Sequence, residues 1–173
     1  SLTSITLPDS LVLLGEGAFS NSGITKLHIP AKVRTSDNAT QTLLMSPAPY
    51  CSNLTEITVD EANAYYKSVD GVLLTKKGNI LIQYPAGKAD TTYAVPDGVL
   101  IVRPAAFTGA AHLTDVTLPD TVTTLFGNAF YACPGVKVFD VPAGTQTLNN
   151  YSLAFGTEVT ERAIFIKGYR RLI

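Results

Sequence analysis

The chain has 173 residues, of which 46% are hydrophobic and 16% charged, and its formal net charge is −1. Such a composition excludes a disordered segment, and apolar runs of only a few residues indicate no membrane insertion by this segment. The near-neutral charge also argues against nucleic acid as a partner.

A repeat of 22 to 23 residues begins at the start of the chain. Residues 2–9 (LTSITLPD) return almost unchanged as residues 113–120 (LTDVTLPD). The proline that ends this segment recurs at intervals of 22 or 23 residues, as Pro8 and Pro30 and again as Pro96, Pro119 and Pro142. A period this regular predicts an array of similar structural units.

The pattern of apolar residues within each unit predicts one short β-strand with one buried face. Apolar residues at its first, fourth and sixth positions alternate with polar residues, and proline ends the strand because it has no N–H for a ladder. In chain order we expect strands near residues 4–7, 26–29, 56–59, 93–95, 115–118 and 137–140, with a further coil at residues 163–166.

An Ala-Phe pair follows the strand and is expected to fill the interior of the coil near a tight turn. The pair occurs at residues 18–19, 106–107 and 129–130, whereas Pro49 stands where Phe is expected in the second coil. One unit cannot bury its apolar face alone, so neighbours must stack at about 4.8 Å per strand. The sequence therefore predicts a mostly β, right-handed solenoid of about six coils. Its short parallel strands each have a partner above and below, and the leucine and phenylalanine positions form continuous ladders.

Two segments interrupt this array. Residues 34–47 lengthen the second coil, and residues 60–92 form a longer insertion. Within the insertion, residues 70–75, the turn 76–78 and residues 79–84 predict a β-hairpin. We expect residues 1–173 to form a single domain and, because the first residues already lie inside a repeat, to be part of a longer protein.

The LTxITLPDxV…AF repeat, together with residues 69–73 (VDGVL) and 84–88 (YPAGK), resembles the BspA-type leucine-rich-repeat family over roughly residues 1–160. The resemblance implies a leucine-rich-repeat solenoid and a bacterial protein that is secreted or on the cell surface. Some members are implicated in adhesion to host matrix proteins or other cells. The family shares no catalytic residues, so the resemblance transfers no site.

Residues suited to catalysis or metal binding are few. Cys51 and Cys133 occupy equivalent corners about three coils, or roughly 14 Å, apart, which is too far for a disulfide. We therefore predict two free, buried thiols. His28 and His112 have no partner at the spacing of a metal site or catalytic triad. We expect no enzyme, no metal and no cofactor.

Two surfaces are candidates for binding. The first is the outward strand face, on which we expect parallel stripes that include Lys26, His28, Glu56, Thr58, Asp115 and Thr117. The alternative is a solvated sheet face, in which threonine is simply a good strand former. The second candidate consists of the insertion aromatics Tyr65, Tyr66 and Tyr84, for protein or sugar contact, with packing against the coils as the alternative.

We interpret the chain as a non-catalytic protein-binding module of a bacterial cell-surface or secreted protein. Host matrix proteins, neighbouring-cell proteins and glycans are the candidate ligands, the first two on the basis of the resemblance. The alternatives are a passive spacer that displays another domain and a glycan-binding module.

Overall fold

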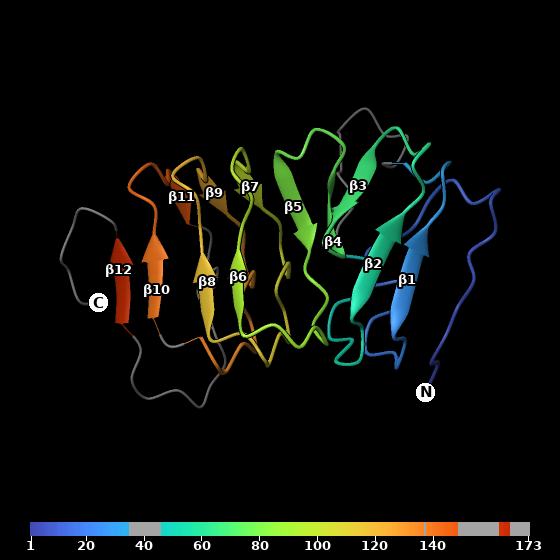
Figure 1. Ribbon diagram of the computed structural model, residues 1–173, viewed down its shortest axis with the longest axis horizontal. Coiled ribbons are helices and arrows are strands. Elements are labelled where there is room, and N and C mark those ends of the chain that lie inside the picture. Colours follow the sequence, from blue (N-terminus) through green and yellow to red (C-terminus); the bar gives the residue numbers. More distant parts are fainter. Residues whose placement is uncertain (35–45, 137, 149–162, 167–173) are drawn as a thin grey trace.

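The computed structural model describes residues 1–34, 46–136, 138–148 and 163–166, and the regular structure in these residues is entirely β. Figure 1 shows the strands stacked along the long axis, from β1 at one end to β12 at the other. The strands are β1 (Lys26–Ile29), β2 (Glu56–Val59), β3 (Tyr66–Val69), β4 (Val72–Thr75), β5 (Ile80–Gln83), β6 (Thr92–Ala94), β7 (Ile101–Val102), β8 (Asp115–Thr117), β9 (Thr124–Leu125), β10 (Val138–Val141), β11 (Thr147–Leu148) and β12 (Ala163–Ile166).

The strand that opens each coil pairs in parallel with the equivalent strand of a neighbour. β1 pairs with β2, β6 with β8, and β10 with β12, each in register along its length. β1, β2 and β12 have the predicted bounds, and β6, β8 and β10 differ from theirs by one residue. The period and its apolar positions therefore located these strands to within one residue, although Asp60 stands where a proline would end β2.

The strand expected at residues 4–7 does not form. Ile5 and Leu7 are only half-buried, and in the described residues the first coil has one β-bridge, between Leu13 and Arg34. In the described residues this coil has a neighbour on one side only. The burial that holds the inner strands in place is therefore incomplete here.

The insertion is larger than the predicted hairpin. β4 and β5 form that hairpin as expected, but β3 precedes them and pairs antiparallel with β4, so the insertion is a three-stranded meander. β5 then pairs in parallel with β7, which continues through β9 to β11. β5 is thus the return leg of the third coil, and the insertion is built into the solenoid as part of a six-stranded sheet.

The meander also interrupts the front sheet, so the expectation that each strand has a partner above and below is wrong between β2 and β6. Ile57 of β2 donates its N–H to the carbonyl of Gly71, at 2.9 Å, and its carbonyl accepts the hydroxyl of Ser68, at 2.6 Å. The edge of β2 is therefore occupied, and Figure 1 shows β4 and β5 between β2 and β6. β1–β2 and β6–β8 consequently form separate sheets.

An aromatic ladder fills the coil interiors. Phe107 and Phe130 stack with ring centroids 4.7 Å apart and planes at 9°, close to the spacing of neighbouring strands. Tyr84 stacks on Phe107 at 5.4 Å. The N–H of Tyr84 bonds to Ala106 O just as that of Phe107 bonds to Ala129 O. Tyr84 therefore occupies the phenylalanine position of the third coil.

In the second coil, the residue at the phenylalanine position differs from the one expected. Phe19 donates its N–H to Pro47 O at 2.9 Å, and this register places Ala48 opposite Phe19. Ala48, rather than Pro49, is the residue at the phenylalanine position. The hydrogen-bond register between the first and second coils decides which residue occupies this position. Counting residues along the sequence gave Pro49 because the second coil is longer than its neighbours. Of that lengthened segment, residues 35–45 lie outside the described residues.

The two cysteines are free and fully buried, as predicted. The Cys51 thiol donates to Phe19 O at 2.9 Å, and the Cys133 thiol donates to Phe107 O at 3.0 Å. Each thiol thus bonds to the preceding coil in the same way, which shows that the two residues hold equivalent corner positions.

Candidate binding surfaces

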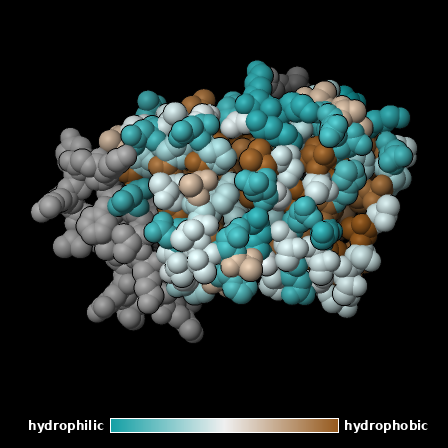
Figure 2. Space-filling model, viewed as in Figure 1, coloured by the Kyte–Doolittle hydropathy of each residue, from teal (hydrophilic) through white to brown (hydrophobic). Residues whose placement is uncertain are grey.

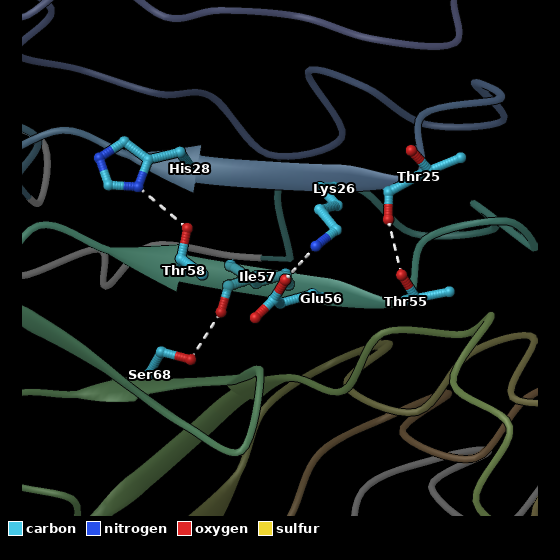
Figure 3. A network of polar contacts seen from close by, with 8 residues as sticks. All are labelled: Thr25, Lys26, His28, Thr55, Glu56, Ile57, Thr58 and Ser68. Carbon is cyan, nitrogen blue, oxygen red and sulfur yellow. Dashed lines mark hydrogen bonds and ion pairs between the residues drawn. The ribbon is translucent and has the colours of Figure 1, made fainter.

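The exposed face of β1 and β2 brings together four of the predicted surface residues (Figure 3). The register places Lys26 beside Glu56 and His28 beside Thr58. The Lys26 ammonium lies 2.9 Å from the Glu56 carboxylate, and His28 Nδ1 lies 2.9 Å from Thr58 Oγ1. Two cross-strand pairs therefore give this face an ordered array of charge, donor and acceptor.

These pairs order the surface more than they stabilise it. The Lys26 and Glu56 side chains are 73% and 40% exposed, and an exposed ion pair contributes only about 0 to 1 kcal/mol. At the start of the two strands, the Thr55 hydroxyl donates to Thr25 O at 3.1 Å, which adds a further link between the coils. The side chains on this face are thus restricted in position before any partner binds.

Asp115 and Thr117 lie on a different sheet. Both are exposed on β8, where they pair with Thr92 and Ala94 of β6. The meander lies between this sheet and β1–β2 (Figure 1). The six predicted strand-face residues therefore form two separate patches instead of continuous stripes. The sequence could not show this, because it predicted the hairpin but not where the hairpin docks.

The insertion aromatics divide between surface and core. Tyr65 is 44% exposed, whereas Tyr66 is 0% and Tyr84 is 1% exposed. Tyr66 is therefore a core residue, and the hypothesis that its ring contacts a ligand is wrong. For Tyr66 and Tyr84, packing against the coils is the correct interpretation.

Asn63, which no sequence pattern singled out, fixes the backbone of Tyr65 and Tyr66. Its side chain is fully buried and donates to Pro30 O and Val33 O at 2.8 and 2.9 Å. Its Oδ1 accepts the N–H groups of Tyr65 and Tyr66 at 2.8 and 2.9 Å. A single polar residue in a loop gave no sequence signal, because two of its four partners are backbone carbonyls distant in sequence.

An open cavity of about 490 Å³ lies at the exposed end of the meander. Its lining combines cationic, polar and aromatic side chains: Ala64, Tyr65, Thr75, Lys76, Lys77, Asn79 and Ile80. Figure 2 shows hydrophilic residues along the upper edge of the molecule, where Figure 1 places the β4–β5 turn. The sequence favoured a turn at Lys76 and Lys77, with a basic patch as the less favoured alternative.

The titratable groups with shifted pKa values are the buried Tyr84 and the half-buried Tyr93 and Arg103. Burial raises the pKa of Tyr84, with Asp90 and Tyr93 adding to the effect. Burial likewise raises the pKa of Tyr93, with a contribution from Asp70. Burial lowers the pKa of Arg103, against the opposing effect of Glu16, and its guanidinium lies 5.3 Å from the centre of the Phe126 ring.

Across the described ranges, no three histidine, cysteine, aspartate or glutamate side chains gather where they could hold a metal ion. Within the same ranges, no helix has the length and apolarity that crossing a membrane requires.

A model of the "BspA type Leucine rich repeat region" matches residues 1–69 and 89–167 in six copies, in agreement with the predicted number of coils. The interval between the matched ranges falls in the insertion. No curated protein is significantly similar to the chain.

Three solved structures share the fold. A leucine-rich repeat protein from Eubacterium ventriosum is 28% identical with a TM-score of 0.74, over 83% of this chain and 37% of that one. The pneumococcal vaccine antigen PcpA is 25% identical with a TM-score of 0.66, over 82% and 39%. A leucine rich cell surface protein from Faecalibacterium prausnitzii is 22% identical with a TM-score of 0.59, over 98% and 55%. The chain thus spans only 37 to 55% of the length of these proteins.

Proposed function

The chain belongs to the BspA type leucine-rich repeat family, and on this premise we propose that it is a non-catalytic protein-binding module of a bacterial cell-surface or secreted protein. Its ligand is a host matrix protein or a protein of a neighbouring cell. The family supplies the repeat architecture, and a similar structure is named as a cell surface protein. Solenoids offer extended surfaces of this kind to their partners.

The observation that supports the proposal most is the ordered polar face of β1–β2. Lys26 and Glu56 provide both signs of charge, and His28 and Thr58 provide a second polar rung beside them (Figure 3). Cross-strand contacts limit the freedom of these side chains before a partner arrives, so less conformational entropy is lost on binding. Complementary charges on the partner would set the orientation of the complex.

The test is a binding screen of the purified chain against immobilised matrix proteins, followed by variants at the β1–β2 face. The triple variant Lys26→Ala/His28→Ala/Glu56→Ala is expected to weaken binding about tenfold or more, which corresponds to ~1.4 kcal/mol. A protein ligand that binds the triple variant as tightly as the parent would refute the assignment of this face.

The second predicted patch supplies a matched control. Asp115→Ala/Thr117→Ala removes exposed strand residues from the β6–β8 sheet and is expected to leave binding unchanged. Binding lost only in this control would move the site to β6–β8. The absence of any protein ligand in the screen would instead support the alternative of a passive spacer that displays another domain.

A further inference from the structure

We propose that the cavity at the end of the meander is a subsite for an acidic glycan, in which a sugar ring packs against Tyr65 while its carboxylate or sulfate meets Lys76 and Lys77. The cavity of about 490 Å³ falls in the size range of small-ligand sites and suits one or two sugar rings. This site is separate from the β1–β2 face and independent of the protein ligand proposed above.

Positive charge converges on the β4–β5 turn. Lys76 and Lys77 line the cavity, and the Lys67 ammonium lies over Gly78, 2.8 Å from where a Cβ on that glycine would be. Lys76 Nζ donates to the backbone carbonyl of Glu61 at 3.1 Å. The ion pairs found within the described residues involve Lys26 and Lys88, so this cluster keeps its charge available for an anion.

The neutral groups of the lining add donors. The Thr75 hydroxyl donates to Asn79 Oδ1 at 2.9 Å, and this bond fixes the orientation of the amide. The Asn79 NH₂ group remains as a donor, and the Tyr65 hydroxyl can donate as well. A ligand that satisfies ammonium, amide and phenol groups together must be rich in acceptors and carry negative charge.

The aromatic wall favours a sugar over an acidic peptide. Tyr65 is 44% exposed, and its backbone is held by Asn63 Oδ1 and by Lys76 N–H, so the position from which its ring extends at the cavity edge is fixed. The C–H face of a pyranose can cover such a ring while its acid group reaches the lysines. A peptide would need an apolar pocket for an anchor residue, but Ile80, the largest aliphatic residue of the lining, is only 7% exposed.

The experiment compares heparin oligosaccharides, polygalacturonate, neutral dextran and polyglutamate as ligands of the purified chain by calorimetry. Heparin and polygalacturonate separate sulfate from carboxylate recognition. We expect at least one of them to bind, and to bind more weakly in high salt because the interaction is ionic. Dextran that binds as tightly, polyglutamate that binds more tightly, or failure of both acidic glycans would overturn the proposal.

Variants locate the site. Lys76→Gln/Lys77→Gln is expected to weaken glycan binding about tenfold or more, whereas Lys26→Gln/Lys32→Gln removes the same charge elsewhere and should leave it unchanged. Tyr65→Ala should weaken glycan binding but not any residual binding of polyglutamate. Equal losses in the two lysine variants, at unchanged melting temperature, would show nonspecific charge attraction and refute the subsite.

Discussion

The side-chain amide of Gln83 pairs with the backbone of Ala48 as a neighbouring strand would. Its Nε2 donates to Ala48 O at 2.6 Å, and its Oε1 accepts the N–H of Ala48 at 3.0 Å. Both residues are buried, Ala48 at 0% and Gln83 at 2% exposure. The side chain of Gln83 thereby joins the second coil to the meander. Between the other coils, backbone-to-backbone hydrogen bonds make the equivalent link.

Replacement of Gln83 by leucine should destabilise the chain strongly. The N–H and C=O of Ala48 would remain buried without partners, and each such group costs about 1 to 3 kcal/mol. We expect a loss of about 3 kcal/mol in the free energy of unfolding, measured by urea titration with circular dichroism. Gln146→Leu, at an exposed position, is the matched control, and equal losses in the two variants would contradict the pairing argument.

Asn63→Ala should destabilise the loop that positions Tyr65. The substitution removes two donors and an acceptor that serve four backbone groups. We expect a loss of about 3 kcal/mol in stability and faster hydrogen exchange at the amides of Tyr65 and Tyr66. Asn53→Ala, at an exposed asparagine, should change neither measurement. Unchanged exchange at both amides would show that Asn63 does not hold this loop.

Alkaline pH should destabilise the fold through Tyr84 and Tyr93. Burial raises the pKa of each above its unfolded value of 10.0, so the folded state favours the neutral phenol. The resulting stability is fully present below pH 10 and is lost as the pH rises further, because the unfolded state releases these protons first. Unfolding titrations between pH 8 and about 11.5 measure the loss.

The double variant Tyr84→Phe/Tyr93→Phe should lose less stability over the same pH range. Both hydroxyls are buried without a hydrogen-bond partner among the described residues, so their removal should not destabilise the chain at neutral pH. Tyr65→Phe/Tyr131→Phe, at exposed tyrosines, is the control and should retain the alkaline sensitivity of the parent. The same alkaline loss in both double variants would assign it to other groups.

Neither thiol should react in the folded chain. Cys51 and Cys133 are fully buried, and each donates to a carbonyl of the preceding coil. A thiol reagent needs access to the thiolate, which burial prevents. We expect negligible labelling under native conditions and two labelled thiols in urea, counted by mass spectrometry. Rapid labelling of either cysteine under native conditions would show that the turn around it unfolds locally and exposes the thiol.

The repeat architecture was predictable because its determinants are local and recur. Each strand is specified by alternating apolar residues at fixed positions within one period, so β1 and β2 were located to the residue even though β2 lacks the strand-ending proline. The equivalent corners of Cys51 and Cys133 followed from counting residues along the same period. Part of the candidate surface was predictable for the same reason, since β1 and β2 pair in the expected register and place Lys26 beside Glu56.

The sequence by itself determined the number of coils, the inward and outward faces of the strands, and the presence of a hairpin. Only the tertiary structure decided that the meander occupies the edge of β2, that it buries Tyr66, and that Tyr84 continues the aromatic ladder. The physical reason is that hydrophobic periodicity shows which side chains of a strand are buried when the chain folds. Contacts between segments distant in the chain, such as Gln83 with Ala48, depend on backbone positions that no local pattern encodes.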